Sequence, residues 1–293
     1  MIWGVGTITQ INICVKNLAE ADLSHTRWLP ISEFSTQKIQ DALTTKTLGR
    51  RLAIVNTCTS TSDIAEHFAL AGAPNGMTVI AVQQSHGRGR FGRSWCSPPG
   101  GLWMTIVLRY PEFPVFAAEI PLLGALSIAR TLNSMFGIHS LVKWPNDVVI
   151  RSNKVAGTIA QSRFDGNNFL FTLLGIGVNA NFQRSLIRDA NPNSTTILDE
   201  LNDQVDINHV ASSVLNEIEI IFSLAAQNQT DHILELLSAT DYSRGRRVKV
   251  TIPPHTVEGR FRKYRSLSEV EIDKDGEYVI VEQGKATGVE YID

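Results

Sequence analysis

The sequence predicts an α+β fold, in which a mixed or mostly antiparallel sheet with flanking helices precedes a small β-rich domain. Strand-like runs are common up to residue 242, but few alternate with helices in regular strand–helix–strand units. The chain has 293 residues, 43% of them hydrophobic, which is enough to fill two cores. We divide it into an N-terminal extension of unknown role (1–45), a larger domain (46–242) and a small C-terminal β-barrel (243–293).

The first regular elements begin near residue 51. Residues 1–35 show no sustained periodicity and are too short for a winged helix-turn-helix with its linker, so we interpret them as an arm or extension. A strand is expected over 52–58. The next helix has apolar residues at i, i+1, i+4 and i+7 from Ile64 and ends at Gly72, where a left-handed conformation is wanted.

The middle of the chain combines strands with one more helix. Pro121 stands near the start of that helix, where its missing N–H does no harm, and Gly137 ends it. Strands, the second of them alternating, are expected over 78–83, 103–110, 141–144, 148–150, 155–160 and 169–178.

Two helices and a β-rich tail complete the pattern. Apolar residues spaced by three and four predict a long helix over 207–226, and a shorter one lies around 233–237. The runs RRVKVTI, VEGRFR, EVEID and EYVIVE are typical of strands. Turns are expected at Pro253-Pro254 and at 273–276.

Charge and cysteine content argue against several function classes. With 27 basic and 29 acidic residues the net charge is -2, so no overall basic charge favours nucleic acid or an anionic membrane. The three cysteines form no CxxC pair and are too few for a disulfide framework, which favours the cytoplasm. The longest apolar stretch, within 169–178, is about half of a membrane span. We therefore expect neither a DNA nor a membrane partner.

The most informative segment is QQSHGRGRFGRSWCSPPGGLW, residues 83–103. Its glycines allow close backbone approach, and the arginines between them offer planar forks for phosphate or carboxylate. We interpret it as an anion-binding loop, although an exposed basic loop or an RNA-binding tract would have a similar composition. The spacing of Gly87, Gly89 and Gly92 is a weak dinucleotide signature, because no helix signal follows.

Two further segments place polar residues beside strands. KWPND (143–147), followed by Lys154 and Gly157, supplies cations, an amide and a carboxylate that can bind a nucleotide triphosphate with Mg²⁺. In GIGVNAN (175–181) small residues admit a flat ring, and Asn179 offers a donor and an acceptor that suit an adenine edge. Read alone, each segment also fits an ordinary turn or strand end.

In order and spacing, these segments together resemble the biotin protein ligases. GRGRFGRSW followed by SPPGGLW resembles the family's biotinyl-adenylate loop, KWPND its nucleotide and metal segment, and KVAGTIAQ its lysine–glycine segment. GIGVNAN resembles the adenine-binding strand end, and CTSTS (58–62) the Ser-Thr-Asn turn that opens the first helix. The resemblance covers about residues 48–178. The β-rich tail is similar to the family's SH3-like C-terminal barrel.

The resemblance implies a class II synthetase-like catalytic domain and a two-step reaction. Biotin and MgATP would give biotinyl-5′-AMP and pyrophosphate, and a lysine of a biotin carboxyl carrier protein or domain would then attack the mixed anhydride. The cofactors implied are ATP and Mg²⁺, with biotin as substrate. A homodimer through an edge strand is possible. Because no DNA-binding domain is recognisable before Arg51, we expect a ligase without a repressor function.

The resemblance also assigns catalytic roles. Arg88 and Arg90 would hold the carboxylate and the adenylate phosphate, where charge shifts as the anhydride forms and breaks. Lys154 would contact the biotin carboxylate and the α-phosphate. Arg93 and Lys143 would reach the outer phosphates.

Further residues would bind the metal, the adenine and the biotin ring. Asn146 and Asp147 would help to place Mg²⁺, with Asp147 as the metal ligand. Asn179 would contact the adenine. The ureido ring would be hydrogen-bonded by Ser60, Thr61, Ser62 and Gln84. The remaining binding candidates in these motifs are Gly87, Gly89, Trp95, Gly101 and Gly157, of which the glycines leave room for the ligand.

The chain departs from the family's usual pattern at several positions. Ser62 stands in place of an asparagine and Gln161 in place of a glutamate, which removes one amide and one carboxylate. His86 replaces an alanine, and Thr158 belongs to the altered KVAGTIAQ segment. These changes concern fine substrate geometry more than the reaction.

Two alternatives remain open. A lipoate or octanoate ligase or transferase would share the fold, but such proteins characteristically carry Arg-Arg-x-Ser-Gly-Gly-Gly, which this chain lacks. A non-enzymatic nucleic-acid-binding regulator could use the arginine-rich loop and the basic start of the tail, although the near-neutral charge argues against it. Zinc hydrolase and serine hydrolase functions are rejected, because the sequence offers no ligand cluster and no placed His/Asp pair.

Overall fold

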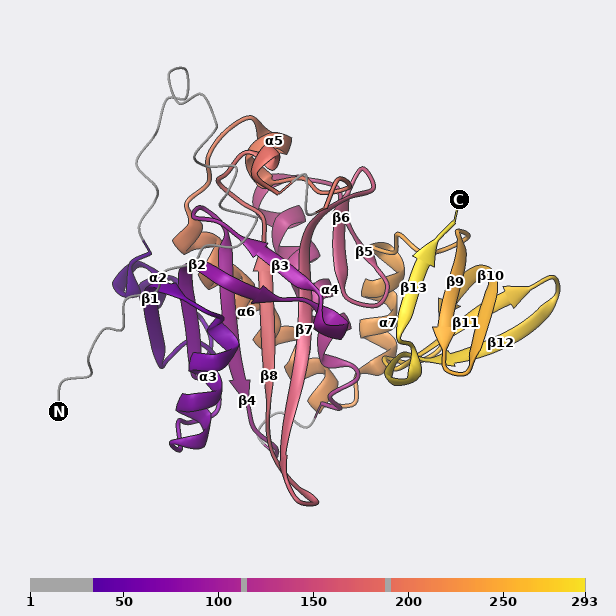
Figure 1. Cartoon of the computed structure of the whole chain (residues 1–293), viewed down its shortest axis with the longest axis horizontal. Helices are drawn as coiled ribbons and strands as arrows, with labels where there is room; N and C mark the ends of the chain where they lie inside the picture. Colours follow the sequence, from indigo (N-terminus) through magenta and orange to yellow (C-terminus); the bar gives the residue numbers. More distant parts are fainter. Residues whose placement is uncertain (1–33, 112–114, 188–190, 293) are drawn as a thin grey trace.

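The computed structural model describes residues 34–111, 115–187 and 191–292, which form two sheets with helices around the larger one (Figure 1). The strands of the larger sheet are β1 (Leu52–Cys58), β2 (Thr78–Arg88), β3 (Ser94–Ser97), β4 (Leu102–Leu108), β5 (Ser140–Lys143), β6 (Asp147–Ile150), β7 (Asn153–Asp165) and β8 (Asn168–Val178). Their order is β1-β2-β4-β8-β7-β6-β5, with β3 paired to β2. β1 and β2 run parallel and the other pairs run antiparallel, so the predicted mixed sheet is confirmed.

Helices cover both faces of this sheet. They are α2 (Thr36–Ala42), α3 (Thr61–Leu70), α4 (Ile120–Phe136), α5 (Ile197–Leu201), α6 (Ile207–Ala226) and α7 (Thr230–Ala239). α4 packs on β5 to β8, and α6 packs on α4. α3 packs on β2, β4 and β8 from the opposite face, in a separate hydrophobic cluster.

Local sequence explains where the main elements begin and end. The Ser60 hydroxyl accepts a hydrogen bond from the Ser62 N–H at 3.3 Å and so caps the start of α3. Pro121 lies in the first turn of α4, and Gly137, with φ of 65°, ends it. The predicted bounds 52–58 and 207–226 are those of β1 and α6.

The alternation expected in the strand 103–110 is wrong. β4 is buried along its whole length, because the α4 and α6 layer covers one face and α3 with the loops beside it covers the other. β2 and β7 are longer than expected, since β2 continues to pair with β3 and β7 forms a long hairpin with β8. Short elements such as α2, α5, β3 and β13 (Gly288–Tyr291) were not predicted from the sequence.

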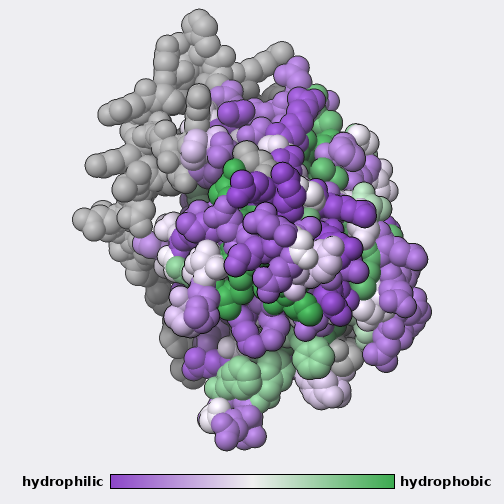
Figure 2. Space-filling model, turned by 90° about the vertical axis from the view of Figure 1, so that its right-hand side faces the viewer, coloured by the Kyte–Doolittle hydropathy of each residue, from purple (hydrophilic) through white to green (hydrophobic). Residues whose placement is uncertain are grey.

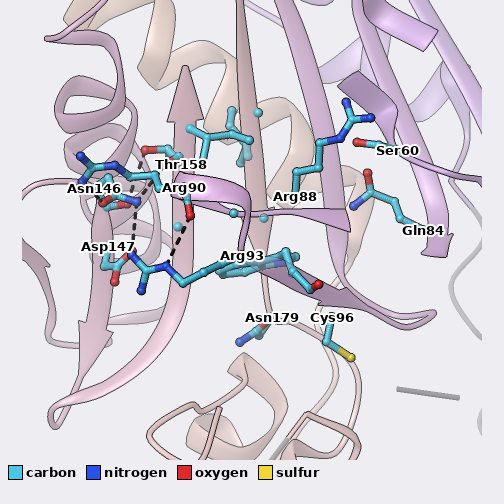
Figure 3. A pocket seen from close by; sticks show the side chains of 18 of the residues that line it. Ser60, Gln84, Arg88, Arg90, Arg93, Cys96, Asn146, Asp147, Thr158 and Asn179 are labelled. Atoms are coloured by element: carbon cyan, nitrogen blue, oxygen red, sulfur yellow. Dashed lines mark hydrogen bonds between the residues drawn. The ribbon is translucent and has the colours of Figure 1, made fainter. Parts of the chain in front are cut away.

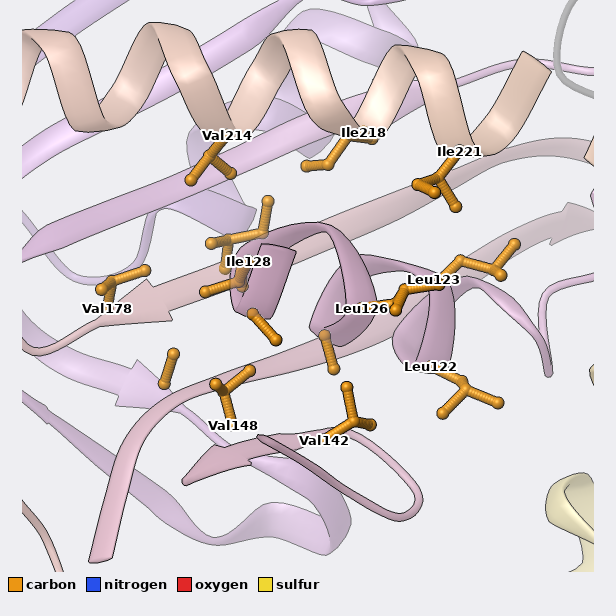
Figure 4. Close-up of a cluster of buried hydrophobic side chains, with 14 of the residues drawn as sticks. Leu122, Leu123, Leu126, Ile128, Val142, Val148, Val178, Val214, Ile218 and Ile221 are labelled. Atoms are coloured by element: carbon orange, nitrogen blue, oxygen red, sulfur yellow. The ribbon is translucent and has the colours of Figure 1, made fainter. Parts of the chain in front are cut away.

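The main core lies between α6, α4 and the sheet (Figure 4). In that figure Val214, Ile218 and Ile221 of α6 face α4, while Val142 and Val148 approach α4 from the strands. Among the described residues, α6 is the one helix with the length and apolar composition of a membrane span. Its apolar face is buried against α4 and α2, which makes it a core helix here.

The described end of the predicted N-terminal extension, from α2 onward, packs against the larger domain. Ile39 of α2 is fully buried and Leu43 is nearly so, in the same core as α4 and α6. The Glu219 carboxylate accepts hydrogen bonds from the N–H groups of Thr47 and Leu48, at 3.0 and 2.8 Å. Residues 36–48 are therefore continuous with the core of the larger domain. Residues 1–33 lie outside the described residues.

The tail forms a five-stranded antiparallel sheet, in which β12 and β13 are the two ends of the strand order. Its strands are β9 (Arg247–Ile252), β10 (His255–Tyr264), β11 (Glu269–Lys274), β12 (Glu277–Glu282) and β13 (Gly288–Tyr291), in the order β12-β11-β10-β9-β13. The turns expected at 253–254 and within 273–276 are present. Figure 2 looks at the side of the molecule on which this sheet lies and shows a mostly hydrophilic surface with small, separate hydrophobic patches.

The junction between the two sheets combines apolar packing with hydrogen bonds. The rings of Trp144 and Phe261 lie 6.1 Å apart, and one hydrophobic cluster extends through both parts of the chain. The Tyr291 hydroxyl lies 2.5 Å from the Ser243 hydroxyl and donates to the Trp144 carbonyl at 3.2 Å. Beside them Asp241 accepts a hydrogen bond from the Ser243 N–H at 2.7 Å.

Asp241 makes the stability of this junction dependent on pH. Burial raises the pKa of its carboxyl from 3.8 to about 6. Since the folded-state pKa lies above the unfolded value, the stabilisation tied to the protonated form is complete below about pH 3.8 and is lost as the pH rises through about 6. In urea titration at pH 8, we expect Asp241→Asn to raise the free energy of unfolding above that of the wild type by up to about 3 kcal/mol. This difference should shrink towards pH 5. Exposed Asp165→Asn is the control; a gain at pH 8 that equals the gain at pH 5 would contradict the assignment.

Candidate active site

A cavity of about 350 Å³ opens on the sheet face that α3 partly covers (Figure 3). Thr105 of β4 and Gly175 and Gly177 of β8 line it. They point to the same side as Val107 and Leu173, which pack against α3, because alternate strand residues share a face. The cavity is thus the part of this face that α3 leaves uncovered.

Most of the residues predicted from the motifs surround this one cavity. Those that line it are Ser60, Thr61, Ser62, Gln84, Arg88, Gly89, Arg90, Arg93, Trp95, Asn146, Asp147, Lys154, Gly157 and Asn179. They come from the start of α3, the β2–β3 hairpin, β6, β7 and the end of β8. Segments up to about 120 residues apart in sequence therefore meet at one site.

One end of the cavity is lined by hydroxyls and an amide. The Gln84 Oε1 accepts from the Thr61 N–H at 2.8 Å, and the Gln84 Nε2 donates to the Ser97 hydroxyl at 2.8 Å. The hydroxyls of Thr61 and Thr105 lie 2.8 Å apart. This network fixes the orientation of uncharged donors and acceptors. Thr105 and Ser97 were not predicted from the sequence. The rule that alternate strand residues share a face could have placed Thr105, although both faces of β4 are buried.

The other end gathers charge around Asp147. The Lys154 Nζ lies 2.6 Å from the Asp147 Oδ1, and the Asn146 Nδ2 donates to the same oxygen at 3.2 Å. The Arg90 Nη1 donates to the Asn146 Oδ1 at 3.0 Å, as the dashed lines in Figure 3 show. Burial lowers the pKa of Arg90, while Asp147 opposes this effect. Two cations beside one carboxylate leave an excess of positive charge for an anionic ligand.

The Trp95 ring occupies the space that the small residues leave. A Cβ on Gly177 would come within 2.6 Å of the Trp95 Nε1, and the Lys154 Nζ lies 4.8 Å from the ring centre. The flat ring that lies against these glycines is thus this chain's own indole. The indole N–H is buried without a hydrogen-bond partner in the described part of the chain, so it offers a donor to a ligand in the cavity.

The predicted anion loop is a strand pair with a tight turn. β2 runs on to Arg88 and pairs with β3, and Phe91, with φ of 57°, lies in the turn between them. The Arg88 Nη2 lies 2.6 Å from the Asp63 carboxylate in the first turn of α3. The Arg93 Nε donates to the Arg90 carbonyl at 3.4 Å. These contacts hold the arginines at the cavity without a ligand.

Three predicted residues do not line the cavity. A Cβ on Gly87 would lie 2.4 Å from the Trp95 carbonyl, so Gly87 permits the pairing of β2 with β3. A Cβ on Gly101 would lie 2.1 Å from the Trp103 ring, so the room at Gly101 is filled by the protein itself. The Lys143 Nζ lies 4.4 Å from the centre of the Tyr291 ring, at the junction with the C-terminal sheet.

A segment around 191–196 was missed and holds Lys154 from behind. The Lys154 N–H donates to the Asn193 carbonyl at 2.8 Å, and the Lys154 carbonyl accepts from the Thr195 N–H at 2.9 Å. The Asn179 Nδ2 donates to the Thr195 carbonyl at 3.0 Å. Asn179 therefore fixes the main chain beside Lys154. No local signal in the sequence identifies this contact.

Other chemistries find little support in the described residues. They contain no group of three His, Cys, Asp or Glu side chains that could hold a metal ion. Burial, with a contribution from Asp63, raises the pKa of the Cys58 thiol to about 11, which leaves almost no thiolate at neutral pH.

Comparison with known proteins adds the family. Residues 53–179 match the Biotin/lipoate A/B protein ligase family, and every residue predicted from the motifs lies within this range. A biotin--[acetyl-CoA-carboxylase] ligase of Mycobacterium tuberculosis is 28% identical over 80% of this chain and 88% of its own length. The chain is similar to biotin protein ligases over most of its length. That alignment, over 247 residues, is longer than the range that the family model matches.

Two further relatives define the extent of the likeness. The bifunctional ligase/repressor BirA of Bacillus spizizenii is 33% identical over 52% of this chain, which spans about half (47%) of that relative's length. The biotin protein ligase of Aquifex aeolicus, solved in complex with biotin and ATP, superposes with a TM-score of 0.73 over 83% of this chain and 100% of its own, at 23% identity. The chain thus has the fold of that ligase, with a mixed sheet and a C-terminal antiparallel sheet, as predicted.

The role of Gly101 can be tested by substitution. Because a Cβ at this position would overlap the buried Trp103 ring, we expect Gly101→Ala to lower the free energy of unfolding by about 1–3 kcal/mol in urea titration. Gly284→Ala is the control, because a Cβ there would lie an ordinary 3.6 Å from the Ala118 Cβ and the backbone needs no positive φ. Unchanged stability of Gly101→Ala would restore the view that Gly101 makes room for a ligand.

Proposed function

We propose that this chain is an ATP-dependent biotin–[biotin carboxyl carrier protein] ligase of the cytoplasm. It forms biotinyl-5′-AMP from biotin and MgATP, and transfers the biotinyl group to a lysine of a biotin carboxyl carrier protein or domain. The observation that carries the proposal is one cavity with an uncharged hydrogen-bonding end and a cation-rich end, built from the family's motifs.

The uncharged end suits the ureido ring of biotin. A buried ureido group has two N–H donors and a carbonyl acceptor, and each needs a partner. Ser60, Thr61, Ser62 and Gln84 offer such partners on fixed elements. The dithiolane ring of lipoate has no comparable donors or acceptors and would use none of these partners. The geometry therefore favours biotin over the lipoate alternative.

The cation-rich end suits the carboxylate and the α-phosphate. Arg90 and Lys154 carry positive charge at this end, where the two anionic groups would approach, while Arg88 lines the cavity beside Ser60 and pairs with Asp63 (Figure 3). In the first step a carboxylate oxygen of biotin bonds to the α-phosphorus, and the bond to the leaving pyrophosphate breaks. Charge develops on the α-phosphate oxygens in this step, and prearranged cations in a half-buried site stabilise it strongly.

Magnesium fits this end with few protein ligands. Asp147 and Asn146 bring a carboxylate and an amide into the cavity, and Mg²⁺ usually takes one or two carboxylates together with substrate phosphates. Bound there, Mg²⁺ would neutralise phosphate charge. Asp147 would hold it, while the Asn146 oxygen stays oriented by Arg90.

The second step requires the site to retain the adenylate. The carrier lysine, as free amine, attacks the carbonyl carbon of the mixed anhydride; the bond from that carbon to the phosphate oxygen breaks, AMP leaves and the amine loses a proton. Arg90, hydrogen-bonded to Asn146 from the turn between β2 and β3, lies where it can hold the phosphate until the lysine arrives.

The proposal is tested by incubation with biotin, MgATP and a biotin carboxyl carrier domain, followed by intact-mass measurement of the carrier. We expect the mass of one biotinyl group to be added, and none when ATP is omitted. A lipoyl domain with lipoate is the parallel reaction. Transfer of lipoate in preference to biotin, or no transfer in either reaction, would overturn the proposal.

Lys154 should act mainly on chemistry. Its ammonium group lies at the cation-rich end and meets charge that develops during adenylation, so Lys154→Ala should slow biotinyl-AMP formation by about 10²-fold or more. Biotin affinity should fall less. Single-turnover adenylation measures the first effect and calorimetry the second, with exposed Lys46→Ala as the control. Adenylation at the wild-type rate in Lys154→Ala would refute the assigned role.

A further inference from the structure

A buried glutamine connects the C-terminal sheet to the catalytic domain. Gln283 opens a 3-10 turn, Gln283–Lys285, between β12 and β13, and only 4% of its surface is exposed. Its Oε1 accepts from the Trp144 indole N–H at 3.1 Å, and its Nε2 donates to the Ala118 carbonyl at 2.5 Å. Both ends of one amide are thus satisfied by the other domain, just before α4 and within KWPND.

Trp144 transmits this contact to the cation-rich end of the cavity. The indole packs against Phe261 and is 1% exposed, while the Trp144 N–H donates to the Ser243 hydroxyl at 3.0 Å. Asn146 and Asp147 follow Trp144 after a single proline. The position of the turn that carries them is therefore fixed by partners in the C-terminal part of the chain.

The segment of the 3-10 turn also contacts the hairpin of β2 and β3. The Arg90 Nη2 donates to the Ala286 carbonyl at 3.2 Å, directly after the 3-10 turn, while the Arg90 Nη1 donates to Asn146. One short segment of the C-terminal domain thus holds Trp144 from one side and Arg90 from the other. Neither contact involves the hydroxyl-lined end of the cavity, which begins with Ser60 and Gln84.

We propose that Gln283 is a positioning residue for the cation-rich end of the site, acting through Trp144 on Asn146 and Asp147. The inference rests on the proposed ligase function and adds that the C-terminal domain supports nucleotide binding but not biotin binding. Loss of the Gln283 amide removes the partners that it gives to the Trp144 indole N–H and the Ala118 carbonyl. The 3-10 turn would then no longer hold the KWPND turn in place. Nucleotide binding should suffer and biotin binding should not.

The test compares Gln283→Leu, which keeps much of the side-chain volume, with Lys285→Ala in the same turn. The Lys285 Nζ contacts only Glu282 among the described residues, and both side chains are exposed. For Gln283→Leu we expect the KM for MgATP to rise about tenfold and biotin affinity without nucleotide to stay within about twofold. The thermal shift produced by MgATP with biotin should shrink accordingly. Lys285→Ala should behave as the wild type.

A second variant separates positioning from general destabilisation. Trp144→Phe keeps an aromatic ring against Phe261 but removes the N–H that Gln283 accepts, so it should also raise the KM for MgATP. The double variant should raise it by clearly less than the product of the two single effects. If Gln283→Leu folds poorly, Trp144→Phe alone tests the connection, through its KM for MgATP and its biotin affinity.

The outcomes distinguish the two proposals. An inactive wild type would refute the ligase function itself. If the wild type is active and Gln283→Leu lowers only the melting temperature, or raises the KM for MgATP and weakens biotin binding to the same degree, Gln283 is structural and the positioning role is wrong. Fully multiplicative effects of Gln283→Leu and Trp144→Phe would likewise contradict the connection through Trp144.

Discussion

The Asp147 carboxylate is the interaction on which the rest of the site depends. Lys154 and Asn146 both donate to its Oδ1, and Arg90 donates to Asn146 in turn. A half-buried carboxylate of this kind keeps two cations close together that would otherwise repel each other, and it does so before any anion binds. The same oxygen donors suit Mg²⁺ beside substrate phosphates. Charge attraction inside the site thus prepares it for charged substrates.

The second constraint is that the cavity must remain open on a sheet face. β-strands normally fill such a face with side chains. Here Gly157, Gly175 and Gly177 have none and leave space, part of which the Trp95 ring fills. The segment 191–196 and Asn179 brace Lys154 from behind. These contacts fix the position of Lys154 beside the cavity. Catalysis needs such fixed positions, because small displacements of the reacting groups slow the reaction.

The departures from the family's pattern have different structural weight. The Thr158 hydroxyl donates to the Pro121 carbonyl at 2.6 Å, a bond that an apolar side chain could not make, and so ties β7 to the start of α4. Ser62 is buried, with its hydroxyl 3.4 Å from that of Thr105. His86 is exposed and lies beside the Ser85 hydroxyl, away from the cavity lining. Nothing in the described structure explains Gln161.

The sequence by itself determined which chemical groups the site contains. GRGRFGR supplies Arg90, and KWPND supplies the neighbouring Asn146 and Asp147. Local patterns in the sequence also predicted the bounds of β1 and α6. Only the tertiary structure decided which of these groups share a cavity. Thr105 lines the cavity although it was not predicted, and Lys143 was predicted but lies beside Tyr291 instead. Strand pairing and the packing of other elements on the sheet decide which face a strand side chain occupies. Gln283 joined the site's support for the same reason, since a contact across 139 residues of sequence depends on packing between domains and leaves no periodic trace in the chain.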